Sequence, residues 1–299
     1  MLVGEVWLGS GQSNMAMGVS RAKDFEAEKA AANLPLVRMF TEGSRVAAAP
    51  QENGTGAWKV CAPETVGTFS ATLFFFGREL HRELKVPVGL INSSVGGTPI
   101  ESWIAADAQS ASPELRAANE AAAKAAAKAE AEFDVEAAKA AHAKALARWK
   151  TLAAKAKAEG KPAPRAPKDP VAMRERKGNI GGLFNGKIAP LIPYAIRGVV
   201  WYQGEANSHP GKGAFYQHQL PLLVTDWRAR WGAEFPFAWV QLPNFERENT
   251  GDNWLLVREA MLKTLKLPKT GMAITVDIGD PKDIHPKNKQ EVGDRKSVV

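Results

Sequence analysis

Short apolar runs that end in glycine or polar residues recur along this chain, and helical patterns separate them. The runs are GEVWLGSG (4–11), PVGLINSSVGG (87–97), RGVVWYQ (197–203), FPFAWVQLP (235–243) and GMAITVDI (271–278). They lack the regular alternation of apolar and polar residues that marks a strand with one exposed face. Helices are expected at 69–84 and around 183–192, 213–231 and 254–266. This order predicts a parallel sheet covered on both faces, with the ligand site beyond the carboxyl ends of its strands.

Composition narrows the class of protein further. The 299 residues are 45% apolar and 24% charged, as in a globular chain with a real core. No apolar run approaches the ~20 residues that span a membrane. The segment MLVGEVWLGSG (1–11) lacks the basic region and the long apolar region of a signal peptide, so none is expected in it. The net charge is +7, but no basic stripe carries interleaved aromatic residues, so nucleic-acid binding is not predicted. Cys61 is the single cysteine, and we expect a buried structural thiol.

Residues 113–170 differ from the rest of the chain. Of the 42 residues in 117–158, 21 are Ala, mixed with Lys and Glu as in a semi-rigid helical spacer. The Pro-rich stretch KPAPRAPKDP (161–170) follows and must be extended. We interpret 113–170 as a helical insertion within a domain that spans 1–299, either one long helix or a hairpin broken near Phe133. A structural role or a docking site for a protein partner fits it better than chemistry.

Two motifs at opposite ends of the chain fit nucleophilic catalysis. GQSNM (11–15) places Ser13 where the first strand gives way to a helix, although a serine in such a turn is commonly a helix N-cap. GDPKDIHP (279–286) follows the last strand and puts Asp283 two residues before His285. A serine hydroxyl needs an imidazole to take its proton, and the imidazole needs a group that fixes its tautomer. The alternative is that Asp283 caps the final helix and that His285 is a surface residue.

Two further strand ends offer donors for an oxyanion. They are SSVGGTPIESW (93–103) and WYQGEAN (201–207). Acyl transfer passes through a tetrahedral oxyanion that needs preorganised N–H groups. Gly96 or Gly97 can supply a backbone N–H, and Gln203 or Asn207 a side-chain amide. The alternative is that these residues are tight-turn glycines and structural polar groups.

Together, four blocks resemble the sialate O-acetylesterase-like carbohydrate esterases of the SGNH hydrolase superfamily. The blocks are GEVWLGSGQSNM, SSVGGTPIESW, LFNGKIAPLIPYAIRGVVWYQGEAN and DIHPKNKQEVGDR. They stand in the family's order and span nearly the whole chain, apart from 113–170. The resemblance implies a three-layer α/β/α flavodoxin-like fold with a central parallel sheet, and hydrolysis of sugar acetyl esters without a metal or cofactor.

The resemblance also assigns roles to residues. It makes Ser13 the nucleophile and His285 the general base and acid. The Ser13 N–H, the N–H of Gly97 (with Gly96 as second choice) and Gln203 would form the oxyanion hole. Asn207 is a second candidate for the side-chain donor.

The third member of the triad follows the family pattern less closely. The superfamily often places its Asp three residues before the His, where this chain has Lys282. Asp283 is therefore taken as the triad carboxylate, with Asp280 or a backbone carbonyl as the alternative. Glu205 is expected to orient the loop that carries Gln203.

We therefore expect a serine esterase that removes O-acetyl groups from sugars, with acetylated sialic acid or acetylated xylan as substrate and neither nucleic acid nor membrane as partner. The rivals are a short-chain lipase or arylesterase of the same superfamily and a catalytically decayed glycan-binding domain. Similar proteins are mostly exported and longer at both ends, which implies export and a truncated or excised catalytic domain. Four aromatic side chains near strand ends are expected to be core residues rather than sugar-stacking platforms: Trp103, Trp201, Tyr202 and Trp254.

Overall fold

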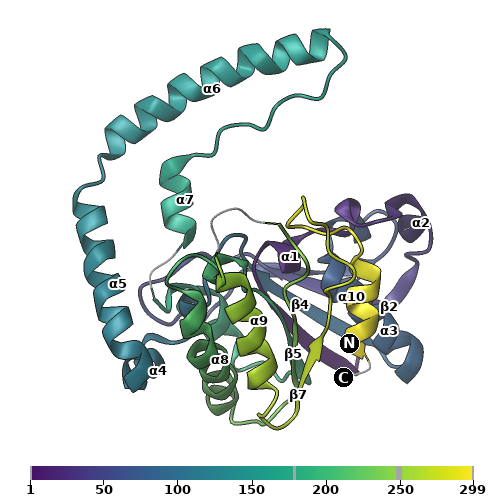
Figure 1. Ribbon diagram of the computed structural model, residues 1–299. Coiled ribbons are helices and arrows are strands. Elements are labelled where there is room, and N and C mark those ends of the chain that lie inside the picture. Colours follow the sequence, from purple (N-terminus) through teal and green to yellow (C-terminus); the bar gives the residue numbers. More distant parts are fainter. Residues whose placement is uncertain (1, 178–179, 247–250, 298–299) are drawn as a thin grey trace.

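The computed structural model describes residues 2–177, 180–246 and 251–297, and its centre is a sheet of seven strands in the order β3-β2-β4-β1-β5-β6-β7 (Figure 1). The strands are β1 (Glu5–Gly11), β2 (Leu34–Glu42), β3 (Gly56–Cys61), β4 (Val88–Ser94), β5 (Gly198–Tyr202), β6 (Phe237–Val240) and β7 (Thr270–Ala273). Every pair of neighbours is parallel except β2 and β3. The prediction of an entirely parallel sheet is therefore wrong at this edge. The segment 43–55 contains no helix that could carry the chain back to the start of β2, so β3 returns antiparallel.

The strand order also departs from the flavodoxin-like order expected. Counted along the chain, the six parallel strands lie in the order 2-3-1-4-5-6, with β4 between β2 and β1, whereas flavodoxin-like sheets have 2-1-3-4-5. From β1, the chain first builds the side that holds β2 and β4, and later the side that begins with β5. Open α/β sheets bind ligands at the point where the strand order reverses direction. In this sheet that point is β1, so a ligand site is expected at the carboxyl end of β1.

Helices cover both faces of the sheet and make three layers, as predicted. On one face lie α3 (Ala71–Leu84) and α10 (Lys289–Ser297), and on the other α8 (Tyr216–Trp231) and α9 (Asn253–Thr264) (Figure 1). The two faces of β5 enter different cores, because successive side chains of a strand point in opposite directions.

Buried aromatic residues and the cysteine confirm their predicted structural roles. Trp103, Trp201 and Tyr202 have no exposed surface, and Trp254 is only 6% exposed, so all four belong to the core. Cys61 is also buried, and burial raises the pKa of its thiol to about 11. Such a thiol is not poised as a nucleophile.

The remaining helices are shorter or lie outside these layers. They are α1 (Ser13–Ala16), α2 (Phe25–Ala30), α4 (Ala106–Ala111), α5 (Pro113–Ala131), α6 (Val135–Ala158) and α7 (Pro170–Lys177). Short 3-10 turns occupy Val19–Arg21, Val66–Thr68, Ile100–Ser102, Ala189–Leu191, Glu205–Asn207 and Gly213–Phe215. The helix expected around 183–192 is a π-helical turn at Phe184–Ile188 followed by one of these 3-10 turns. No helix in the described part of the chain combines the length and apolarity of a membrane span.

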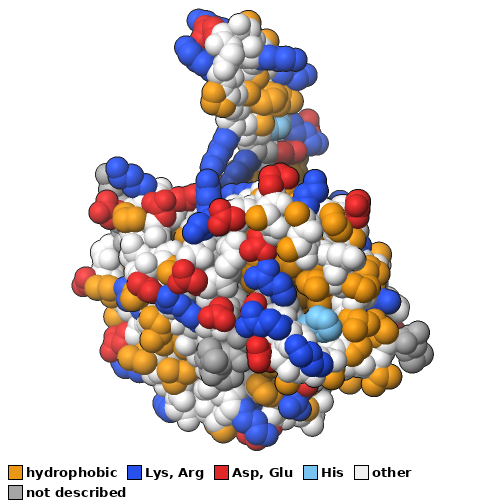
Figure 2. Space-filling model, turned by 90° about the vertical axis from the view of Figure 1, so that its right-hand side faces the viewer, with side chains coloured by type: hydrophobic (Ala, Val, Ile, Leu, Met, Phe, Trp, Pro, Cys, Tyr) orange, Lys and Arg blue, Asp and Glu red, His pale blue; other side chains and the backbone are white. Residues whose placement is uncertain are grey.

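Residues 113–170, here called the arm, project from the body of the molecule (Figures 1 and 2). The arm rises through α5, bends at 132–134 and continues as α6, so the expected break near Phe133 is present. The Asp134 carboxylate accepts the Ala137 N–H at 2.8 Å and caps α6. The Pro-rich segment then returns toward the body, and the indole N–H of Trp149 donates to the Pro164 carbonyl at 2.7 Å. This bond ties the returning segment to α6.

Candidate active site

Ser13 begins α1 directly after the central strand. Gly11 permits this sharp entry, because it has φ +131° and a Cβ there would lie 2.2 Å from the Tyr202 carbonyl oxygen. The N-cap of α1 is Gln12, and the Ser13 side chain makes no hydrogen bond to any residue in the described ranges. The helix-cap alternative is therefore wrong. Ser13 is partly exposed and its hydroxyl is available for reaction.

His285 and Asp283 lie together in the loop that follows β7. The Asp283 Oδ1 is 3.7 Å from Nδ1 of His285 and accepts the backbone N–H of His285 at 2.9 Å. The distance to the ring exceeds that of a hydrogen bond. Because α10 begins only at Lys289, Asp283 does not cap the final helix. Asp280 accepts the Lys282 N–H at 2.8 Å instead, so Asp283 is the carboxylate next to the imidazole.

The surroundings of His285 favour its neutral form. Burial first, and then the positive charge of Arg21, lower the pKa of the imidazole below its ordinary 6.5. The Asp283 carboxylate acts in the opposite direction, while Lys289 and Arg165 act like Arg21. A general base must be neutral at the working pH, so this shift suits the proton transfer expected of His285.

Asn14 joins the loop of the serine to the loop of the histidine. Its Nδ2 donates to the Ile284 carbonyl at 2.9 Å and to Glu205 Oε1 at 2.6 Å, and its Oδ1 accepts from Lys289 Nζ at 2.6 Å. Within the described residues no hydrogen bond connects Ser13 and His285 themselves. The structure therefore brings Ser13 and His285 to the same edge of the sheet. Their loops are joined by the hydrogen bond between Asn14, which follows Ser13, and Ile284, which precedes His285.

Lys289 and Glu205 are charged residues buried behind this edge. Lys289 has no exposed surface, and burial lowers the pKa of its ammonium group to about 7. Glu205 is 2% exposed, and burial raises the pKa of its carboxyl group. Our sequence analysis missed Lys289 and Asn14. Asn14 is adjacent to Ser13 in GQSNM, a signal that could have found it, whereas nothing in the sequence marks Lys289 as buried.

The glycine turn after β4 packs against the serine. A Cβ at Gly96 would lie 3.4 Å from the Cβ of Ser13, and Gly97 has φ +74°, in the left-handed region. The Val95 N–H donates to the Gly11 carbonyl at 3.0 Å and ties this turn to the end of β1. Neither the Ser13 N–H nor the Gly97 N–H donates a hydrogen bond to a described residue. Both remain available to an incoming oxygen.

The two predicted amide donors are already occupied. Gln203 Nε2 donates to the Thr98 carbonyl at 3.2 Å and to Asn207 Oδ1 at 2.7 Å. Asn207 Nδ2 donates to Glu101 Oε2 at 2.9 Å, and its Oδ1 also accepts the Ile100 N–H at 2.9 Å. Both side chains are buried. A direct contact with an oxyanion would require one of these bonds to break.

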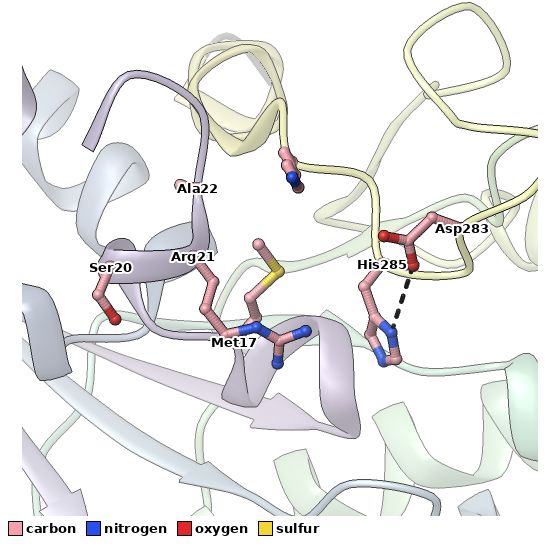
Figure 3. A pocket seen from close by; sticks show the side chains of 7 residues that line it. Met17, Ser20, Arg21, Ala22, Asp283 and His285 are labelled. Atoms are coloured by element: carbon pink, nitrogen blue, oxygen red, sulfur yellow. Dashed lines mark hydrogen bonds and ion pairs between the residues drawn. The ribbon is translucent and has the colours of Figure 1, made fainter. Parts of the chain in front are cut away.

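A pocket of about 310 Å³ opens beside the histidine (Figure 3). Its lining includes Met17, Arg21, Asp283, His285 and Lys287. A second pocket, of about 190 Å³, lies where α5 of the arm meets the loop after β5. The described residues include no group of three or more His, Cys, Asp or Glu side chains arranged to hold a metal ion.

Comparisons with known proteins agree on one family. A family model described as carbohydrate esterase, sialic acid-specific acetylesterase, matches residues 3–138 and 186–295. The sialate O-acetylesterases of Rattus norvegicus and Homo sapiens are 30% and 28% identical to the chain, and each match covers 99% of it. These matches cover 55% and 52% of the relatives, so the chain spans about half the length of the curated relatives it matches.

Solved structures show the same relationship. A carbohydrate acetylesterase from Xanthomonas citri is 32% identical with a TM-score of 0.75, and the match covers 99% of this chain and 55% of that one. A protein from Arabidopsis thaliana is 16% identical with a TM-score of 0.53, and the match covers 98% of this chain and 96% of that one. It shares the fold. Residues 139–185, which include much of the arm, lie outside the family model.

Proposed function

Since the chain belongs to the carbohydrate esterase family of sialic acid-specific acetylesterases, as its four motifs predicted, we propose that it removes O-acetyl groups from sugars as a serine esterase of the SGNH type. The observation that carries the proposal is the meeting of two loops at the carboxyl end of β1. One holds Ser13 and the other holds His285, and Asn14 bonds to the second at Ile284.

The first half of the reaction acylates the serine. The Ser13 oxygen attacks the carbonyl carbon of the acetyl ester while His285 takes the hydroxyl proton. The carbonyl electron pair moves to oxygen, and the N–H groups of Ser13 and Gly97 receive the resulting oxyanion. When the carbonyl reforms, the bond to the sugar oxygen breaks and His285 returns the proton to that oxygen. The products of this half are the free sugar hydroxyl and acetyl-Ser13.

The second half releases acetate. His285 takes a proton from water, the hydroxide oxygen attacks the acetyl carbon, and the proton returns to the Ser13 oxygen as the ester bond breaks. One ester and one water therefore become one sugar hydroxyl and acetic acid. Asp283 is proposed as the carboxylate that orients the imidazole and stabilises its protonated form, which needs the ring to approach closer than 3.7 Å.

Gln203 and Asn207 are proposed to act on the oxyanion hole through the backbone. Their hydrogen bonds to Thr98 and Ile100 hold the segment that follows Gly97. This placement supports a rigid oxyanion turn without a direct amide contact, and it replaces the direct contact expected from the sequence.

The proposed substrate is an O-acetylated sialoside, because that is the substrate class in the family's description. Acetylated xylan is the alternative to test beside it. Export is proposed on the resemblance to exported esterases alone.

The experiment is hydrolysis of 4-nitrophenyl acetate, butyrate and octanoate by the protein and by two variants, Ser13→Ala and His285→Ala. We expect acetate to be the preferred ester and Ser13→Ala to lower kcat/KM by about 10⁴-fold or more, as loss of a triad member does in other serine hydrolases. The matched controls are Ser110→Ala on α4 and His142→Ala on the arm, which should retain full activity. Acetate release from acetylated sialosides and acetylated xylan then identifies the sugar.

Other outcomes would contradict this function. Rates that rise with acyl chain length would indicate a lipase or arylesterase. A folded protein that hydrolyses none of the esters but binds glycans saturably would be a decayed, glycan-binding relative.

A further inference from the structure

The side chain of Arg21 faces the histidine across the pocket. Figure 3 shows its guanidinium turned toward the ring of His285, and both residues line the cavity of about 310 Å³. The side chain of Arg21 is exposed and makes no hydrogen bond or ion pair with any residue in the described ranges. A guanidinium carries five N–H donors and is always charged, so this group offers a strong, unused site for an anion.

Three other arginines on the body pair with carboxylates. Arg78 pairs with Glu28, Arg230 with Asp107 and Asp226, and Arg295 with Asp277. The charges of these three guanidinium groups are therefore already matched by carboxylates. Arg21, beside the proposed general base, has no such pair with a described residue.

The charges around the pocket do not compensate Arg21. Lys287 also lines the cavity, and among the described lining residues Asp283 is the sole carboxylate. Asp283 accepts the backbone N–H of His285 and lies 3.7 Å from its ring, and it forms no ion pair with Arg21. The buried ammonium group of Lys289 and the guanidinium of Arg165, on the returning segment of the arm, add positive potential at His285. A net positive pocket that opens to solvent attracts an anion from outside the protein.

We propose that Arg21 binds a carboxylate of the substrate, which makes the site selective for O-acetylated sugars that carry an acid group. A carboxylate matches the planar fork of a guanidinium and can accept two parallel N–H bonds from it. The acid group would then lie beside His285 while the acetyl ester lies at Ser13. This inference rests on the proposed esterase function and separates acidic sialosides from neutral acetylated xylan oligosaccharides.

The test uses two substrates that differ only at the acid group, O-acetylated N-acetylneuraminic acid and its uncharged carboxamide. The rate of acetate release gives kcat/KM for each substrate, and the measured quantity is the ratio of the two values. We expect the protein to prefer the acid by about tenfold to a hundredfold, the range of a charge-assisted hydrogen-bonded pair. Arg21→Gln should bring the ratio close to one, mainly through KM, because uniform binding is lost. Arg21→Lys should keep part of the preference.

Lys23→Gln is the matched control, because Lys23 is an exposed cation of the same segment that pairs with Asp24. It should leave the ratio as in the unmodified protein. Rising salt should lower the preference of the unmodified protein, because an exposed ion pair is screened, and this measurement does not depend on any variant folding.

The outcomes separate this inference from the function on which it rests. Equal rates on the acid and the carboxamide, or an unchanged ratio in Arg21→Gln, would overturn the role of Arg21 and leave the esterase intact. Absence of hydrolysis of 4-nitrophenyl acetate and of both sugars by the folded protein would instead refute the esterase function.

Discussion

The edge of the sheet that carries the proposed site and the arm are each stabilised by a different kind of interaction. At the edge, Asn14 and Lys289 bond to each other inside the protein although 275 positions separate them in the chain. In the arm, the ion pairs join close neighbours, such as Glu136 with Lys139, and their side chains are largely exposed. Exposed pairs of this kind contribute about 0–1 kcal/mol each. Local sequence therefore suffices to specify the arm, whereas the site exists only when the whole sheet has formed.

The largest expected difference between the two regions is in the response of stability to pH. Lys289 has a folded pKa of about 7, well below the roughly 10.4 of an unfolded lysine. Between these values the unfolded chain binds more protons, so the free energy of unfolding rises with pH. From pH 7 to 10, the unmodified protein should gain on the order of 3 kcal/mol relative to Lys289→Met.

Chemical denaturation of both proteins across this pH range measures the effect. The matched control is Lys155→Met in the arm, where the lysine side chain is 74% exposed. Its curve should follow that of the unmodified protein at every pH. Parallel curves for Lys289→Met would show that the ammonium group is not buried as described, and the contrast between edge and arm would lose its main support.

A smaller effect tests whether the arm acts on the site at all. If His285 is the general base, as proposed, the kcat/KM of the protein should rise with pH through a midpoint below 6.5, because burial and Arg21 lower the pKa of the imidazole. Removing a nearby positive charge makes protonation of the imidazole easier and moves the midpoint upward. Arg21→Gln should therefore shift it more than Arg165→Gln, since Arg165 has the weakest of these effects.

The control for this profile is Arg148→Gln, on α6 of the arm. If Arg148→Gln and Arg165→Gln both leave the midpoint unchanged, the arm is electrically separate from the site. A small shift with Arg165→Gln alone is the expected result, and it would mean that the returning segment adds to the potential at the site while α6 does not. The measurement is the pH dependence of 4-nitrophenyl acetate hydrolysis at constant ionic strength.

The same division explains what could be predicted from the sequence. Residues 4–11 and 69–84 form a strand and a helix as expected, because long apolar runs bounded by Gly or Pro carry their own signal. The strand expected at 271–278 ends at Ala273, because its neighbour β6 ends at Val240 and leaves no partner beyond that point. Local patterns do not encode the length of a neighbouring strand.

The edge strands and the polar contacts of the site show the same limit. The pair β2 and β3 was missed as a pair, since β3 is only six residues long and is largely exposed, so no buried apolar run marks it. For the site, motifs placed Ser13 and His285 at strand ends, and the fold brings these ends together. The occupied amides of Gln203 and Asn207 depend on contacts with residues about a hundred positions away in the chain, which no motif records.

The smallest expected difference between the body and the arm concerns a hydrogen bond from a tryptophan indole N–H to a backbone carbonyl, which occurs in both. The indole N–H of Trp227 donates to the Trp103 carbonyl at 3.0 Å in the core, and that of Trp149 donates to the Pro164 carbonyl at 2.7 Å on the exposed arm. Replacing each tryptophan by phenylalanine removes the donor. Trp227→Phe leaves a buried carbonyl unpaired and a smaller ring in a packed core, so it should lower the free energy of unfolding by about 1–3 kcal/mol.

Trp149→Phe should change that free energy by less than about 0.5 kcal/mol, because water can bond the freed carbonyl at the surface. Its effect should instead be local: trypsin should cut the returning segment after Arg165 and Lys168 faster, while thermal unfolding of the body stays the same. Equal losses of stability in the two variants would show that the arm and the body unfold as one unit, and the arm would then have to be counted as part of the core that supports the site.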